Sequence, residues 1–290
     1  MKKLEIVIVS YNSRFWLRKT LDSLKKFYIP FSKHNIKITL VDNASSDGTA
    51  DIIKSEYSYV NLIKSDKNTG FSAGNNLALK ISEADYIMLL NSDMELTEKS
   101  KNIDILTDYL ENNPDTGIIT PKLLLSNGHI DMACHRGEPN LLDIFFYFAG
   151  FEKLLPKFKF FNKYHMLSED FSKTHEVDAV TGACMIMKNS VLKKIGYFDE
   201  RFFMYSEDMD LCRRFRMSGY KIIYYPEIEI IHHKYKSGLS SANENTKKII
   251  SRHFYNSLLL YYDKYYKNSW YYKTARPLLN LFILLKTRKN

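Results

Sequence analysis

Three short apolar segments in the first third of the chain constrain the fold most, because each ends in a cluster of small polar and acidic residues. The segments span residues 4–9, 36–41 and 86–90. Continuous runs of large apolar and β-branched residues are typical of strands buried on both faces of a parallel sheet. Residues 14–27 have apolar side chains at helical spacing. This alternation predicts an α/β fold, with a mostly parallel sheet and helices on both of its faces.

The remaining elements follow from the same patterns. We expect strands at 60–64, 118–121, 178–187, 221–225 and 228–231, and helices at 49–57, 72–82, 98–112, 190–195 and 207–218. The apolar segment at 139–165 predicts either a helix packed on the core or an insertion that faces lipid or an acceptor. Residues 241–290 predict a helical extension rich in aromatic and basic side chains.

The polar clusters lie where the three segments end. Ser10, Tyr11 and Asn12 follow the first segment, 42–48 follows the second, and 91–93 follows the third. The carboxyl ends of parallel strands share one edge of the sheet, where open α/β sheets bind ligands. The sequence therefore predicts a ligand site at this edge. Turn formation and helix capping are the alternative reason for the Asn, Asp, Ser and Gly residues of 42–48.

The loops of two common nucleotide-binding classes are missing from the sequence. The first strand is followed by neither a Gly-x-Gly-x-x-Gly turn nor a Walker A loop, which disfavours a dinucleotide-dependent enzyme and a P-loop NTPase. Residues 68–76 are rich in Gly and Asn and lead into a predicted helix. Such a segment lets the backbone approach a phosphate or a ribose.

Two further groups of residues are candidates for a metal or catalytic site, with a structural role as the alternative. Glu207, Asp208 and Asp210 crowd the start of a predicted helix, where acids also interact favourably with the helix dipole. His232 and His233 end a strand. Either histidine can be a structural residue or a ligand of a cation held by an acid such as Asp93.

Composition limits the partners and the compartment. The formal net charge of +9 is explained by a generally basic surface, by binding to an anionic membrane face or by binding of anionic substrates. No nucleic-acid reader motif is present. Cys134, Cys184 and Cys212 lack disulfide or zinc spacing, which predicts a reducing cytoplasm. No apolar stretch reaches the roughly 20 residues that span a bilayer.

Six motifs in a fixed order give the chain a family resemblance. They lie at 7–12, 41–49, 68–76, 89–93, 180–183 and 203–211. Together they resemble the family 2 glycosyltransferases with the GT-A fold, and within them the bacterial rhamnosyltransferase-like branch of cell-surface polysaccharide synthesis. The resemblance implies a GT-A domain at 1–240, with a nucleotide-binding half at 1–120 and an acceptor and catalytic half at 121–240.

The resemblance also implies roles for single residues. Asp208 matches the catalytic base, and Asp93 matches the acid that binds Mg²⁺ or Mn²⁺, although Asn91 replaces the first acid of that motif. His232 matches a histidine that completes the metal shell, with His233 as the near alternative. The positions that match donor-binding residues are Ser10, Tyr11, Asn12, Asp42, Gly70, Asn75 and Ser92.

The implied reaction is an inverting transfer from a nucleotide-diphosphate sugar, dTDP-rhamnose or alternatively a UDP-hexose, to a glycan or lipid-linked glycan. A nucleotidyltransferase is disfavoured, because 10–14 contains no Gly. A non-catalytic membrane- or glycan-binding protein would not need Asp93 or Asp208.

The extension predicts how the protein reaches an anionic membrane surface. Phe254, Leu258, Tyr262 and Tyr265 lie near one helical stripe, and 278–285 is apolar with basic residues after it. This pattern is typical of a peripheral anchor at the inner face of the membrane, with core packing or dimerisation as the alternative.

Overall fold

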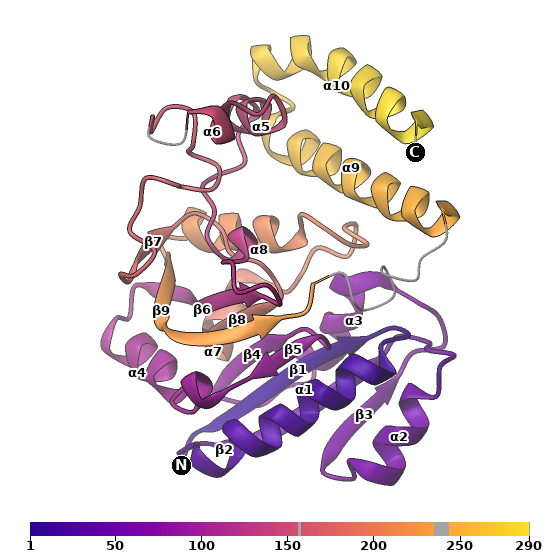
Figure 1. Cartoon of the computed structure of the whole chain (residues 1–290), viewed down its shortest axis with the longest axis vertical. Coiled ribbons are helices and arrows are strands. Elements are labelled where there is room, and N and C mark those ends of the chain that lie inside the picture. The colour runs from indigo at the N-terminus through magenta and orange to yellow at the C-terminus, as the bar shows by residue number, and fades with distance from the viewer. Residues whose placement is uncertain (156–157, 235–243, 290) are drawn as a thin grey trace.

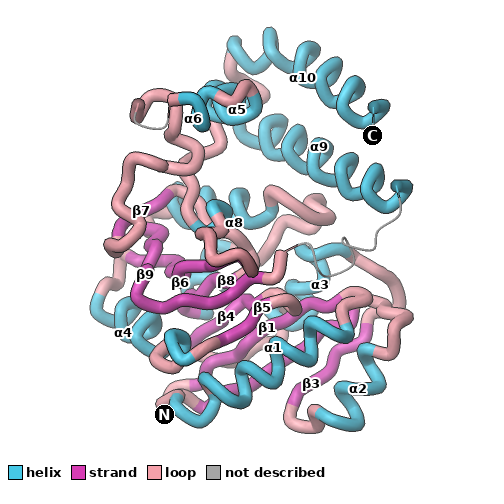
Figure 2. Tube along the Cα trace, viewed as in Figure 1, coloured by secondary structure: helices cyan, strands magenta, loops and turns pink. Residues whose placement is uncertain are grey.

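The computed structural model describes residues 1–155, 158–234 and 244–289, which form one nine-stranded sheet flanked by helices (Figures 1 and 2). The strand order is β3-β2-β1-β4-β8-β6-β9-β5, and β7 also pairs with β9. The strands are β1 (Lys3–Ser10), β2 (Asn35–Asp42), β3 (Val60–Lys64), β4 (Tyr86–Leu90), β5 (Met94–Leu96), β6 (Thr116–Leu125), β7 (His175–Val177), β8 (Cys184–Lys188) and β9 (Lys221–His232).

The first half of the sheet is parallel, as the sequence predicts. β1 pairs in parallel with β2 and β4, and β2 pairs in parallel with β3. Helices α1 (Arg14–Phe27) and α2 (Thr49–Glu56) connect strands that step outward in one direction, so right-handed crossovers place both helices on one face. Helix α3 (Gly70–Leu79) leads back across β1 to β4 and therefore covers the other face.

The second half of the sheet is more mixed than the sequence predicts. β8 lies antiparallel to both β4 and β6, whereas β6 and β9 are parallel. These directions bring the carboxyl end of β9 to the same edge as the carboxyl ends of β1, β2 and β4. The helices here are α4 (Asp104–Asn112), α7 (Asn189–Ile195) and α8 (Glu207–Met217).

The predicted element boundaries differ from the structure in several places, among them the strand expected at 178–187, which spans only Cys184–Lys188. The expected helix at 98–112 is a short 3-10 turn, Glu98–Ser100, followed by α4. The two strands expected at 221–225 and 228–231 are one strand, β9, whose register with β6 shifts after Tyr225. The three-residue strand β5 was not predicted. The expected domain boundary at 240 falls outside the described residues and stays a prediction.

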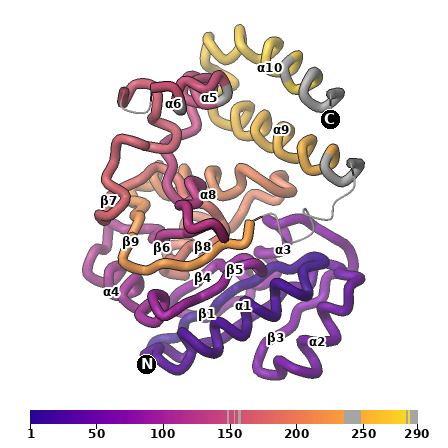
Figure 3. Tube along the Cα trace, viewed as in Figure 1, coloured from indigo at the N-terminus to yellow at the C-terminus, as the bar shows by residue number. Residues whose placement is uncertain are grey.

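Four helices lie at the far end of the molecule's long axis, opposite β2 and β3 (Figures 1 and 3). They are α5 (Leu141–Phe148), α6 (Phe151–Leu154), α9 (Glu244–Tyr266) and α10 (Trp270–Lys289). The aromatic stripe expected to be an anchor on α9 faces the protein instead: Tyr262 is fully buried and Leu258 is nearly so. Among the described residues, no helix is long and apolar enough to cross a membrane.

Candidate active site

Hydrogen bonds and strand pairing connect three of the predicted clusters along the carboxyl edge of the sheet. The Asn91 N–H donates to the carbonyl of Ala183 at 2.9 Å, so the end of β4 adjoins the start of β8. The neighbouring Gly182 N–H donates to the Asp208 carboxylate at 3.3 Å. The end of β9 pairs with β5, with His232 opposite Met94. The acid after β4, the acids of α8 and the histidines of β9 therefore share one edge.

The loops after β1 and β2 are joined through Asn12. Its N–H donates to the hydroxyl of Ser45 at 3.0 Å, and its side-chain oxygen accepts from the N–H of Ser46 at 2.8 Å. Asn12 and Ala44 both have positive φ, a conformation that costs energy in residues other than Gly and clusters at functional sites. Tyr11 is 47% exposed beside this junction and offers an open aromatic ring.

Asn43 joins this junction to the Gly-rich segment. Its amide group donates to the side chain of Asn68 and to the carbonyl of Gly70, both at 3.0 Å. Gly70 has a φ of +81°, and an added Cβ would lie 2.2 Å from the carbonyl oxygen of Phe203. Only glycine therefore allows this turn to approach the loop that precedes α8, where the Phe71 N–H donates to the Phe203 carbonyl at 2.7 Å.

The loop at 203–206 is held by α9. The His253 ring stacks on Phe203 with centroids 4.6 Å apart, and the Ser257 hydroxyl donates to the carbonyl of Met204 at 2.8 Å. Tyr205 and Ser206 have positive φ immediately before α8 begins. The helical extension thus supports the strained turn that presents Glu207 and Asp208.

Asp208 has a buried cation as its partner. The guanidinium of Arg136 donates to Asp208 Oδ2 at 2.7 Å and to the carbonyl of Val180 at 3.0 Å. The Asp208 side chain is only 11% exposed, so little of the carboxylate meets water. This arrangement fixes the Asp208 carboxylate beside the 180–183 turn.

Glu207 lies in a different environment. Its side chain is buried, and its Oε2 has no hydrogen-bond partner among the described residues. Burial, and then the negative charge of Asp208, raise the pKa of Glu207 well above its usual range. The neutral acid is favoured here, and a neutral carboxylic acid cannot accept a proton.

Asp93 and His232 lie close together, as a shared metal site requires. His232 Nε2 is 3.4 Å from Asp93 Oδ1, and His232 Nδ1 is 2.8 Å from Asp131 Oδ2. Burial opposes the charged imidazolium, but hydrogen bonds to Asp131 and Asp93 outweigh it and raise the pKa of His232 to about 9. The protonated ring would donate from Nδ1 to Asp131 and from Nε2 toward Asp93.

His233 points elsewhere. Its Nε2 is 2.7 Å from Glu95 Oε2, its Nδ1 is 2.8 Å from the Ser126 hydroxyl, and its ring packs on Trp16. The His232 ring approaches the Asp93 carboxylate, whereas His233 contacts Asp93 through its backbone N–H, which donates to the Asp93 carbonyl at 2.9 Å.

The donor set around Asp93 fits a divalent cation. Within the described residues, no group of three or more His, Cys, Asp or Glu side chains is arranged to hold a metal by itself. Mg²⁺, however, commonly takes only one or two carboxylates, and substrate phosphates complete its shell. Asp131 would keep His232 Nε2 directed at the ion, as carboxylates do for metal-binding histidines.

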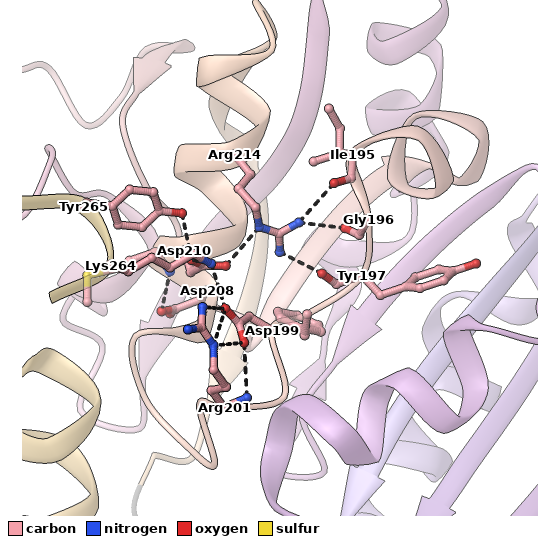
Figure 4. Close-up of polar contacts among 12 residues, drawn as sticks. Ile195, Gly196, Tyr197, Asp199, Arg201, Asp208, Asp210, Arg214, Lys264 and Tyr265 are labelled. Atoms are coloured by element: carbon pink, nitrogen blue, oxygen red, sulfur yellow. Dashed lines mark hydrogen bonds and ion pairs between the residues drawn. The ribbon is translucent and has the colours of Figure 1, made fainter. Parts of the chain in front are cut away.

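Asp210 belongs to the structural side of α8 (Figure 4). Its fully buried carboxylate accepts from Arg214 Nε at 2.9 Å and from the Tyr265 hydroxyl at 2.7 Å, and it pairs with Lys264. Arg214 also donates to the carbonyls that end α7, including Gly196 at 2.8 Å. Asp210 thus joins the helix that carries Asp208 to α7 and α9.

We expect Asp210→Asn to lower the free energy of unfolding by about 2 kcal/mol. Removing one partner of a fully buried pair costs about 3–5 kcal/mol. Lys264 and Arg214 are each 20% exposed, so water offsets part of the loss. Urea denaturation measures the effect. Asp263→Asn is the matched control, because its pair with Arg276 is more exposed and contributes about 0–1 kcal/mol. Equal losses in the two variants would contradict the structural role of Asp210.

Several predicted donor-binding residues are occupied by contacts within the protein. The hydroxyls of Ser10 and Ser92 are linked through Ser13 at 2.7 and 2.9 Å, and both residues are buried. Asp42 is buried and accepts from the Ser45 N–H at 3.1 Å. The amide of Asn75 donates to the Phe71 carbonyl at 2.9 Å within α3. These residues shape the edge, and their contacts with a donor stay predictions.

Sequence reasoning missed Arg136, Asp131 and Asn43 as parts of the site. Arg136 is 72 positions from Asp208, and nothing around it in the sequence singles it out. Asp131 precedes a short 3-10 turn, where an Asp is typical of a helix cap. Its side chain does cap this turn by accepting from the Ala133 N–H. Asn43 lies within the 42–48 cluster, which the sequence singles out. Nothing in the sequence, however, indicates that its side chain holds Gly70.

Comparison with known proteins identifies the family to which the chain belongs. The Glycosyl transferase family 2 profile matches residues 5–196, and the Glycosyl transferase family group 2 profile matches residues 149–285. The chain belongs to glycosyl transferase family 2 and is therefore a glycosyltransferase.

Within the family, the chain is similar to bacterial rhamnosyltransferases. It is 27% identical over 246 residues to the N-acetylglucosaminyl-diphospho-decaprenol L-rhamnosyltransferase of Mycobacterium tuberculosis, covering 80% of this chain and 76% of that protein. It is also 27% identical over 248 residues to rhamnosyltransferase WbbL of Escherichia coli, covering 81% and 85%. The predicted resemblance to the rhamnosyltransferase-like branch is confirmed.

A solved structure supports the fold. The mannosyltransferase PcManGT from Pyrobaculum calidifontis, in complex with GDP-Man and Mn²⁺, superposes with a TM-score of 0.62 at 16% identity, covering 98% of this chain and 70% of that one. The predicted α/β GT-A architecture with a helical C-terminal extension is confirmed.

Proposed function

We propose that this chain transfers a sugar, with inversion, from a nucleotide-diphosphate sugar to a hydroxyl of a lipid-linked glycan in cell-surface glycan synthesis. The observation that carries the proposal is the convergence of Asp208 with the Asp93–His232 pair at the carboxyl edge of the sheet. A base and an acid that can hold a cation are the two groups that such a transfer needs.

Asp208 is the proposed general base. The acceptor hydroxyl attacks the anomeric carbon of the donor sugar from the face opposite the diphosphate, and its proton passes to the Asp208 carboxylate. The bond from the anomeric carbon to the diphosphate oxygen breaks, and its electrons leave with the nucleoside diphosphate. The transition state resembles the oxocarbenium ion of glycoside hydrolysis. Arg136 holds the carboxylate in place before the proton arrives.

Asp93 and His232 are the proposed protein ligands of Mg²⁺ or Mn²⁺. Such an ion would neutralise the charge that develops on the leaving diphosphate. The protein's part is to hold the two side chains 3.4 Å apart and to orient His232 through Asp131.

The preferred donor is proposed to be dTDP-rhamnose, because two relatives of similar length are named rhamnosyltransferases. We expect turnover with dTDP-rhamnose to exceed turnover with UDP-glucose or UDP-galactose, measured as release of the nucleoside diphosphate in the presence of Mn²⁺. Turnover with a UDP-hexose and none with dTDP-rhamnose would assign the chain to the alternative donor class.

A lipid-linked acceptor requires access to a membrane. We propose that the protein works in the cytoplasm at the inner face of the membrane. The alternative, a non-catalytic membrane- or glycan-binding protein, predicts no donor hydrolysis by the purified protein under any metal condition.

A further inference from the structure

Two separate segments expose large apolar side chains at the same end of the molecule. One segment surrounds α5 and α6, the other is α10, and both lie at the end of the long axis that is far from β2 and β3 (Figure 1). Six of the exposed side chains are Phe145, Leu154, Phe158, Trp270, Leu278 and Leu281. We refer to these residues as the apolar cap.

The apolar cap is not the result of a segment that fails to pack. Around α5 and α6 the buried Phe146 contacts Phe161 with centroids 4.8 Å apart, and Phe161 stacks on Phe151 at 5.6 Å. In α10, Tyr272 is buried whereas Trp270 is 79% exposed. Each segment therefore has an inner face that packs on the protein and an outer apolar face that the described chain leaves uncovered.

The charges of these segments are separated by sign. The acids near α5 and α6, Asp143 and Glu152, are buried, and Glu152 is paired with His165 at 2.7 Å. The sequence of α10 contains neither Asp nor Glu. Where the structure describes side-chain exposure in 141–167 and 270–284, the exposed charged residues are Lys159, Lys163 and Lys273. On the two segments themselves, the described exposed charges are therefore positive, and the partly exposed Asp263 of α9 is paired with Arg276 of α10.

We propose that the apolar cap docks on an anionic lipid bilayer, with the α5–α6 segment and α10 inserted side by side into its interface. Exposed apolar side chains suit the acyl boundary of a bilayer, and the lysines of the same segments suit its anionic headgroups. The inference rests on the proposed function for its purpose, which is access to a lipid-linked acceptor. A second copy of the chain fits less well, because a two-fold interface would bring lysines of like charge together.

Vesicle binding tests the proposal with the full chain and without a sugar donor, so its outcome is independent of sugar transfer. The wild type is expected to bind vesicles of phosphatidylcholine with phosphatidylglycerol and to bind phosphatidylcholine alone weakly. Phe145→Ser with Leu154→Ser, and separately Trp270→Ser with Leu278→Ser, should each weaken binding at least about tenfold. Phe31→Ser is the matched control, because Phe31 is similarly exposed but precedes β2 at the other end.

Tryptophan fluorescence tests each segment without removing apolar surface. The chain has two tryptophans, so Trp16→Phe leaves Trp270 as the reporter in α10. Adding Phe145→Trp to a variant that lacks Trp16 and Trp270 moves the reporter to α5. Both reporters should shift to the blue with anionic vesicles. A shift from α10 alone, or unchanged vesicle binding by the Phe145 and Leu154 variant, would overturn the two-segment surface. The wild-type protein could instead fail to bind vesicles and form a dimer that the same substitutions dissociate. That result would show that the apolar cap contacts a second copy of the chain and not a bilayer.

Discussion

Asp208→Asn is expected to lower kcat by about 10²–10⁴-fold while the donor Kd stays unchanged, because that is the usual contribution of a general base. Asparagine keeps the shape of the side chain and can still accept from Arg136 and the Gly182 N–H, which lie 2.7 and 3.3 Å from Asp208 Oδ2. It cannot take the proton of the acceptor hydroxyl. Steady-state rates at saturating donor give kcat, and calorimetry gives the donor Kd.

Glu207→Gln provides the matched control. The buried Glu207 already favours its neutral form, and glutamine is close in shape to a neutral glutamic acid. We expect its kcat to change far less than that of Asp208→Asn. Near-native transfer by Asp208→Asn, or loss of all transfer in a folded Glu207→Gln variant, would move the base to another residue.

The strands, and the acids at their ends, were predictable because a continuous apolar run in the sequence marks both the strand and the position where it ends. An apolar run such as 86–90 has to be buried on both faces, so the residue that follows it emerges at the sheet edge. Asp93 could be placed at the edge on this basis, whereas Asp208 begins a helix and was matched to the catalytic base only through the family resemblance. Arg136 could not be placed, because its pairing depends on how distant loops pack, and a lone Arg after Cys134 carries no periodic signal.

Pro226 explains why β9 was predicted as two strands. Proline cannot donate to a ladder and usually marks an edge or a break. In the structure the register between β6 and β9 shifts between Tyr225 and Glu229, so the proline falls in an irregularity where the missing N–H is tolerated. The chain therefore continues as one strand and carries His232 to the site.

The aromatic stripe of α9 shows a different limit of sequence reasoning. An apolar face with a helical period is the same pattern whether it contacts lipid or protein. Tyr262 of this stripe is fully buried, and the hydroxyl of Tyr265 donates to Asp210 at 2.7 Å, so the stripe packs on the protein. The pattern predicted the helix correctly, but the stripe packs on the protein and not on a membrane. Helix α10, by contrast, keeps an exposed apolar face.

Asp93→Asn should weaken Mn²⁺-dependent binding of a nucleoside diphosphate by about 100-fold, the upper range seen when the groups that support a metal site are changed. The neutral amide removes the negative charge that lies 3.4 Å from His232 Nε2, and a hard cation loses its anionic oxygen ligand. Thermal shifts with dTDP or UDP, with and without Mn²⁺, measure the loss. A ligand at 100 times its Kd stabilises the native state by about 2.7 kcal/mol, so most of the metal-dependent shift should disappear.

Asp85→Asn is the control for this substitution. Asp85 precedes β4 at the opposite edge of the sheet, where its carboxylate accepts from the Lys3 N–H at 2.7 Å. It should keep the full Mn²⁺-dependent shift. If Asp93→Asn also keeps that shift, Asp93 does not bind the metal. The 3.4 Å approach of His232 would then be an ion pair of the fold, and the diphosphate charge would have to be met by other cations of the edge.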